Sequence, residues 1–185
     1  SLPMTGGEVA GKAEIRGIDL SQHPQLQGLG IAAGKLSADI RDFRTSPGRF
    51  PDLALGLDIS DLSVPKNTLI PAELTGQSIL IPRISHLSFA LSGEVKNSIF
   101  TLSKFALSSQ FGEADGNGSI TFGPKNTPGS YDLNFRLRPS EEGQSLITLL
   151  KTLLPSSQSS SGNTGGDWKL TIKGGARPKV ELAAG

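Results

Sequence analysis

The two histidines of the chain, His23 and His86, are the residues best suited to acid–base or metal chemistry at neutral pH. His23 precedes Pro24 in a polar turn, and His86 lies between Ser85 and Leu87 at the start of a strand-like segment. Neither stands in an HExxH motif or at another metal-ligand spacing. Cysteine is absent, which excludes disulfides, thiolate metal sites and a cysteine nucleophile. We expect both histidines to be surface or turn residues.

Serines and carboxylates are numerous, but their spacing forms no known reactive motif. The sequence has no Gly-x-Ser-x-Gly elbow, Walker loop or dinucleotide fingerprint. The segment 115–118 has a faint likeness to a calcium loop but lacks the later ligands of that motif. A glycosidase would need two carboxylates facing each other across a cleft, and the sequence leaves that alternative open. The acidic residues concerned are Glu8, Glu14, Asp19, Asp39, Asp42, Asp52, Asp58 and Asp61. Most fit the solvent face of strands, so we predict a non-enzymatic protein with no catalytic residue, metal site or cofactor.

Charge and composition narrow the function further. The chain has 18 basic and 17 acidic residues, a net charge of +1, and no polybasic cluster. This balance argues against nucleic acid and against an anionic membrane surface as partners. No signal peptide and no apolar run of ~18 residues is present. We interpret the chain as a fragment whose anchor or export signal lies outside it.

Apolar side chains alternate with small or polar ones along most of the chain, which is the period of a strand with one wet face. Residues 131–137 give the clearest case. Similar segments cover 36–40, 53–59, 87–91, 105–107, 120–122 and 168–172. Buried parallel strands would instead be continuously apolar. The pattern therefore predicts a mainly β fold, with an antiparallel sheet that is curved or two-layered.

Glycine, proline and asparagine mark the connections between these strands. We predict turns at Asn97-Ser98, at 123–129 and at Gly174-Gly175, while 115–118 fits either a turn or a glycine-rich strand. Residues 17–21 and 56–60 have similar sequences, which is weak evidence for an internal repeat and leaves two domain organisations open. The chain is a single domain, 1–185, or that domain has two sub-modules, 7–75 and 76–183.

One segment between Pro139 and Pro155 has the period of an amphipathic helix. Its apolar stripe, widened by Ile147, consists of Leu146, Leu149, Leu150, Leu153 and Leu154. Ser140 is the expected N-cap, Pro155 ends the helix, and 156–166 should be a mobile loop. So short a helix covers only part of a long sheet. A second layer, a partner or a ligand must cover the rest.

The bulky apolar residues of the strands have two interpretations, an ordinary core or an open groove that binds a lipid chain or a partner segment. The residues concerned are Leu55, Leu57, Leu87, Phe89, Leu91, Phe105, Leu107, Phe122, Leu133 and Phe135. An ordinary core is the commoner outcome for such residues, and the sequence does not separate the two.

The order of these segments resembles the periplasmic part of the type II secretion system protein N (GspN) family, which is similar to AsmA-like envelope proteins. The segments that carry the resemblance are 16–21, the turn at 24–29, 34–40, 85–93, 111–120, 133–138 and 168–174. They are Gly/Asp/Leu/Ser patterns of low specificity, which many β-repeat proteins share. Together they extend over most of the chain, from about Val9 to Leu182.

The resemblance implies a periplasmic β-domain of an inner-membrane-anchored protein in a Gram-negative bacterium. It implies a structural or assembly component of a type II secretion system, with other envelope subunits as partners and the inner membrane reached through an anchor outside this fragment. The alternative it implies is an AsmA-like lipid-binding or lipid-transport module with an apolar β-groove.

Overall fold

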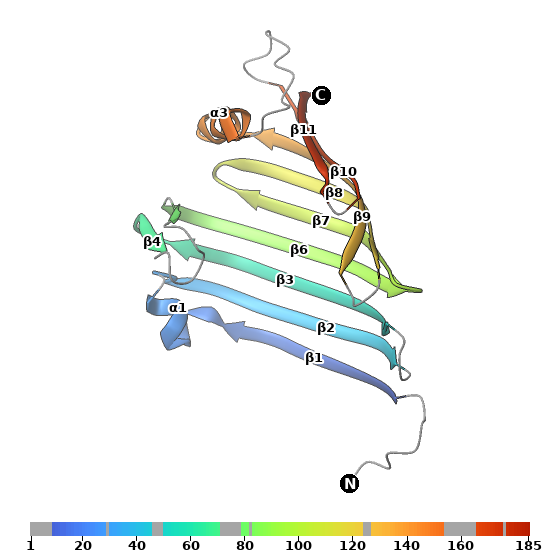
Figure 1. Ribbon diagram of the computed structural model, residues 1–185. Helices are drawn as coiled ribbons and strands as arrows, with labels where there is room; N and C mark the ends of the chain where they lie inside the picture. The colour runs from blue at the N-terminus through green and yellow to red at the C-terminus, as the bar shows by residue number, and fades with distance from the viewer. Residues whose placement is uncertain are drawn as a thin grey trace.

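Nine strands form one open antiparallel sheet, and they lie side by side in the order in which they occur in the chain (Figure 1). The computed structural model describes residues 9–28, 30–45, 50–70, 79–81, 83–123, 127–153, 166–175 and 177–185. The strands of the sheet are β1 (Val9–Asp19), β2 (Ala33–Thr45), β3 (Asp52–Val64), β6 (Ile84–Lys96), β7 (Ile99–Ser109), β8 (Gly112–Phe122), β9 (Pro128–Pro139), β10 (Trp168–Gly174) and β11 (Lys179–Ala184). The predicted mainly β, antiparallel fold is thus confirmed.

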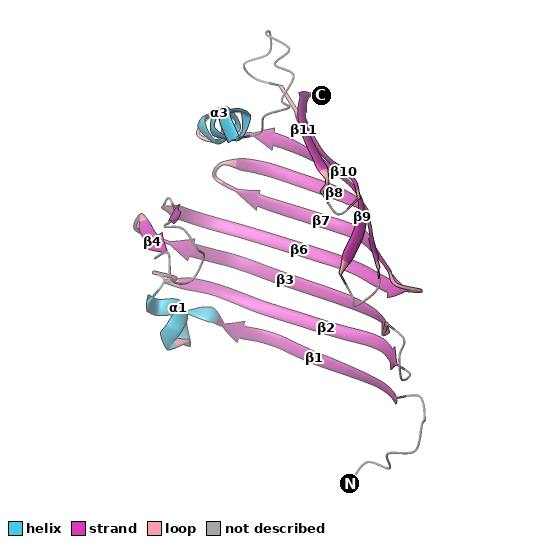
Figure 2. Cartoon of the chain, in the orientation of Figure 1, coloured by secondary structure: helices cyan, strands magenta, loops and turns pink. Residues whose placement is uncertain are grey.

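The remaining elements are small and lie at the margins of the sheet (Figure 2). They are η1 (Leu20–Gln22), α1 (Pro24–Gly28), the hairpin β4 (Thr68–Ile70) and β5 (Ile79–Ile81), and α3 (Gln144–Leu153). None of the helices in the described ranges is long and apolar enough to cross a membrane.

The strand register sorts apolar and polar side chains onto opposite faces of the whole sheet. Residues directly opposite each other in neighbouring strands share a face. One such row runs from Ile15 in β1 to Leu182 in β11. Its members in strand order are Ile15, Ala38, Leu57, Leu91, Phe105, Gly116, Phe135, Leu170 and Leu182. The sheet therefore has one continuous apolar face, about 38 Å across nine strands spaced ~4.8 Å apart.

Glycines in β8 make this apolar face concave. Gly116 lies between Phe105 in β7 and Phe135 in β9, in register with both. The centroids of these two rings are 5.1 Å apart, although a flat sheet would hold strands two positions apart at ~9.6 Å. The rings therefore converge over the space that Gly116 leaves empty. Figure 1 shows the result, because β9–β11 turn sharply relative to β1–β7.

A second ring pair joins more distant strands on the same face. Phe50, which lies just before β3, stacks on Phe122 at the end of β8 with 4.8 Å between centroids. Three strand spacings, ~14 Å, separate β3 from β8 in a flat sheet. This contact therefore also requires the apolar face to curve inward.

The connections follow the sequence prediction closely. Asn97 and Ser98, with φ of 51° and 62°, form the two-residue turn between β6 and β7. Gly174 has a φ of 120° where β10 turns towards β11. The segment 115–118 is strand rather than turn, because glycines at alternate positions fit the crowded concave face of β8.

The predicted helix is present as α3, and Ser140 Oγ accepts a hydrogen bond from the backbone N–H of Gly143 at its start. Regular helix begins only at Gln144, after a turn at 141–143. Apart from Gly166, the loop expected at 156–166 lies outside the described residues, as does the boundary between 75 and 76. Strands β3 and β6, on either side of that boundary, pair directly.

Replacing Gly116 tests the source of the curvature. A Cβ at this position would collide with the Phe135 ring and lie 2.8 Å from the carbonyl oxygen of Asn134. We expect Gly116→Ala to lower the free energy of unfolding by about 1–3 kcal/mol, since the rings can no longer converge. Urea denaturation measures this change. Gly11→Ala in β1 is the control, because a Cβ there meets nothing within 4 Å. Equal effects of the two substitutions would contradict the role given to Gly116.

Candidate functional site

All ten apolar strand residues singled out from the sequence lie on the concave face, and all are half-buried rather than fully buried. Their rings and branched chains contact one another across strands, as Phe89 and Phe105 do at 5.5 Å between centroids. Fully buried side chains of a filled core would be enclosed on every side. These residues instead line a trough that keeps one side open within the described part of the chain.

Helix α3 covers one end of the trough. Ile147 packs with Trp168 in β10 and Leu182 in β11, and Leu137, Leu170 and Ala184 surround this cluster. Leu182 is only 1% exposed, which makes it the most deeply buried large side chain described. The chain therefore has a compact core of its own over β9–β11.

At the opposite end of the trough, Leu20 of η1 is buried beside Gly34 of β2, while isoleucines of β1 and β2 are exposed in the described ranges. Ile15 and Ile18 in β1 and Ile40 in β2 all lie on the apolar face, and Ile15 is 47% exposed. Exposure is thus greatest at the β1 edge, although Val64 in β3, Val95 in β6 and Leu102 in β7 are buried as well. One large apolar surface, continuous with the core, faces solvent.

The helix stripe predicted from the sequence is only partly described. Leu146 is exposed, while Ile147 is the residue that is buried against the sheet. The side chains of Leu149, Leu150 and Leu153, and the whole of Leu154, lie outside the described part of the structure.

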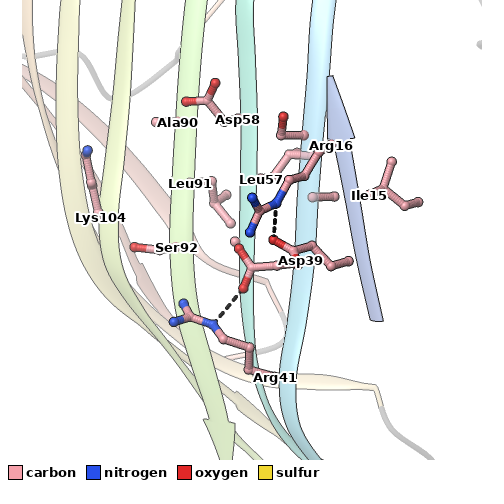
Figure 3. A pocket seen from close by; sticks show the side chains of 14 residues that line it. Ile15, Arg16, Asp39, Arg41, Leu57, Asp58, Ala90, Leu91, Ser92 and Lys104 are labelled. Atoms are coloured by element: carbon pink, nitrogen blue, oxygen red, sulfur yellow. Dashed lines mark hydrogen bonds and ion pairs between the residues drawn. The ribbon is translucent and has the colours of Figure 1, made fainter. Parts of the chain in front are cut away.

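The opposite face of the sheet is polar and contains a shallow hollow of about 360 Å³ over β1, β2, β3 and β6 (Figure 3). Glu14 in β1 lies directly opposite Asp39 in β2. Each carboxylate has an arginine two residues further along its own strand. Arg16 Nε lies 2.5 Å from Glu14, and Arg41 Nε lies 2.7 Å from Asp39. The hydrogen bond to Glu14, followed by the attraction between the two charges, raises the pKa of Arg16.

This arrangement suits a solvated polar surface better than a catalytic pair. Both carboxylates are neutralised by guanidinium groups, and Asp58 at the rim of the hollow is exposed. His23 and His86 are exposed and do not line the hollow. No group of three or more His, Asp or Glu side chains in the described ranges is arranged to hold a metal ion.

Sequence reasoning missed four apolar contributors to the trough, namely Ile15, Ile18, Leu62 and Phe50. Ile15 and Ile18 share a face although they are three residues apart, because Gly17, with φ of 59°, forms a bulge opposite Ser37. Asp61, with φ of 55°, shifts Leu62 back onto the face of Ile59 in the same way. The glycine between Arg16 and Ile18, which interrupts the alternation, was the available signal at Gly17. Phe50 belongs to no strand, so the alternation gave no signal for it.

Comparison with known proteins gave no match: no family model, no curated protein and no solved structure is similar to this chain.

Substitutions in α3 test whether this helix is what covers the trough. Ile147 is 5% exposed and Leu146 is 37% exposed. We expect Ile147→Ala to lower the free energy of unfolding by about 2–5 kcal/mol, because it leaves a cavity beside Trp168 and Leu182. Leu146→Ala should change it by less than about 1 kcal/mol. Thermal unfolding by circular dichroism compares the two, and a larger effect at Leu146 would contradict the packing described.

Proposed function

We propose that this domain binds the acyl chain of a lipid along the concave face of its sheet. The observation that carries the proposal is a single apolar trough, about nine strands long, that is covered by α3 at one end and open at the other. An acyl chain has no polar atoms along its length, so it matches a face with no charged side chain in its rows. Each CH₂ group removed from water contributes roughly 0.8 kcal/mol.

The direction of the apolar rows supports a long, thin occupant. The rows run across the strands, from Ile15 towards Leu182, and the Phe105 and Phe135 rings converge over Gly116 within one of these rows. A chain lying along a row would contact a new strand every ~4.8 Å. The polar face lies on the other side of the sheet, so one layer of backbone would separate the bound lipid from the solvent on that side.

A second function, as a structural component of a type II secretion apparatus, is supported by the resemblance and by the free edge of the sheet. All eleven residues of β1 are exposed, and β1 has β2 as its strand neighbour in the described sheet. Such an edge offers backbone N–H and C=O groups to a strand of another subunit. Periplasmic location and an inner-membrane anchor belong to this proposal too.

Acyl-chain binding is tested with a dansyl-labelled fatty acid, whose fluorescence rises in an apolar environment. Phe89→Asp places a carboxylate in the trough, whereas Ser88→Asp places one on the polar face of the same strand. We expect Phe89→Asp to weaken binding at least about tenfold, because the charge must be desolvated against the chain. Ser88→Asp should leave the affinity within about twofold.

Circular dichroism and urea denaturation of both variants accompany the titration. Phe89 is half-buried, so we expect Phe89→Asp to remain folded. No binding by the wild-type protein, or equal binding by both variants, would contradict lipid binding. Unfolding of Phe89→Asp would favour a filled core over a trough.

A further inference from the structure

The β1 edge carries a self-complementary pattern of charges. On the polar face of β1, Lys12, Glu14 and Arg16 occupy alternate positions, so positive, negative and positive charges follow one another. On the apolar face, Gly11, Ala13 and Ile15 alternate with them. A single lysine on an edge discourages pairing, but here an acidic residue lies two positions away.

We propose that β1 pairs antiparallel with β1 of a second copy of this chain, around a two-fold axis at Ala13. In this register Lys12 faces the second copy's Glu14, and this pair occurs twice by symmetry. Ile15 faces the second copy's Gly11, where a Cβ would meet nothing within 4 Å and an isoleucine therefore has room. Ala13 lies on the two-fold axis and faces Ala13 of the second copy.

Neighbouring registers are less favourable. An axis at Glu14 would place two carboxylates opposite each other and Lys12 opposite Arg16, and an axis at Lys12 would place two ammonium groups together. An axis at Ile15 would bring the bulge at Gly17 into the paired segment. The axis at Ala13 uses residues 11–15, where the register shift opposite Gly11 and Ala13 adds its extra residue to β2 and not to β1, and it stops short of Asp19, where η1 follows.

The pairing would place the most exposed part of the trough beside its counterpart in the second copy. A two-fold axis perpendicular to a sheet keeps each face on its own side, so the apolar faces of both copies would join into one surface. Val9, Ile15 and Ile18 are exposed at this edge and would then lie in the middle of a sheet of eighteen strands, nine from each copy. This inference does not depend on what the trough binds.

Charge reversal tests the register by sedimentation velocity, with protein from about 10 μM to about 1 mM. The wild type should dimerise with rising concentration. Lys12→Glu alone and Glu14→Lys alone each place like charges opposite each other and should weaken the dimer about tenfold. The double variant Lys12→Glu/Glu14→Lys restores opposite charges and should recover wild-type dimerisation. A monomeric wild type throughout this range, or a double variant as weak as the single ones, would overturn the proposal.

A cysteine crosslink provides the second measurement. The chain has no cysteine, so Ala13→Cys introduces the sole thiol. At the axis the two Cα atoms would be about 4.5–5.5 Å apart, within disulfide range. Mild oxidation should give a disulfide-linked dimer. Ala10→Cys is the control, because the two positions would lie about six residues, or ~20 Å, apart. Equal crosslinking of both variants, or none by Ala13→Cys, would contradict the two-fold pairing.

Discussion

An antiparallel sheet with one apolar face is stable in water only when something removes that face from solvent, and this requirement governs the whole domain. Here the face extends about 38 Å across nine strands. The ten-residue helix α3 is only ~15 Å long and buries the face over β9–β11, where Trp168 and Leu182 lie. Over the remaining strands, the curvature of the sheet brings the apolar side chains together and so reduces their exposure to solvent.

Curvature and binding capacity have the same physical origin. Because Gly116 has no side chain, Phe105 and Phe135 converge over β8. Phe50, just before β3, stacks on Phe122 at the end of β8. The same bend that shields these rings also shapes a trough. Full closure would bury the face and leave no room for a ligand, whereas a flat sheet would expose it entirely. The exposed isoleucines of β1 and β2 lie where the curve is least covered. The trough and the β1 edge are therefore two consequences of one uncovered face.

Period-two alternation was sufficient to predict β2, β3 and β6–β10, because each of these strands repeats the same local rule, but it did not predict β1, β11 or the order of the strands in the sheet. Residues 131–137 and 168–172 form β9 and β10 as expected, and the Asn97-Ser98 turn needed only local backbone chemistry. The curvature could not be predicted, since the approach of Phe105 and Phe135 depends on which glycine lies between them across strands. The bulge at Gly17 moved Ile18 onto the apolar face against the simple alternation. Opposition of Glu14 and Asp39 likewise required the strand register.

The central claim is that the apolar face is covered beside α3 and open at the β1 edge, and its methyl groups report this directly. Methyl NMR spectra recorded with a soluble nitroxide measure how closely solvent approaches each side chain. The account predicts strong broadening for Ile15, Ile18 and Ile40, intermediate broadening for Leu57 and Leu91, and protection of Ile147 and Leu182. Uniform protection of all seven, as deep as that of Leu182, would show a filled core and contradict the open trough.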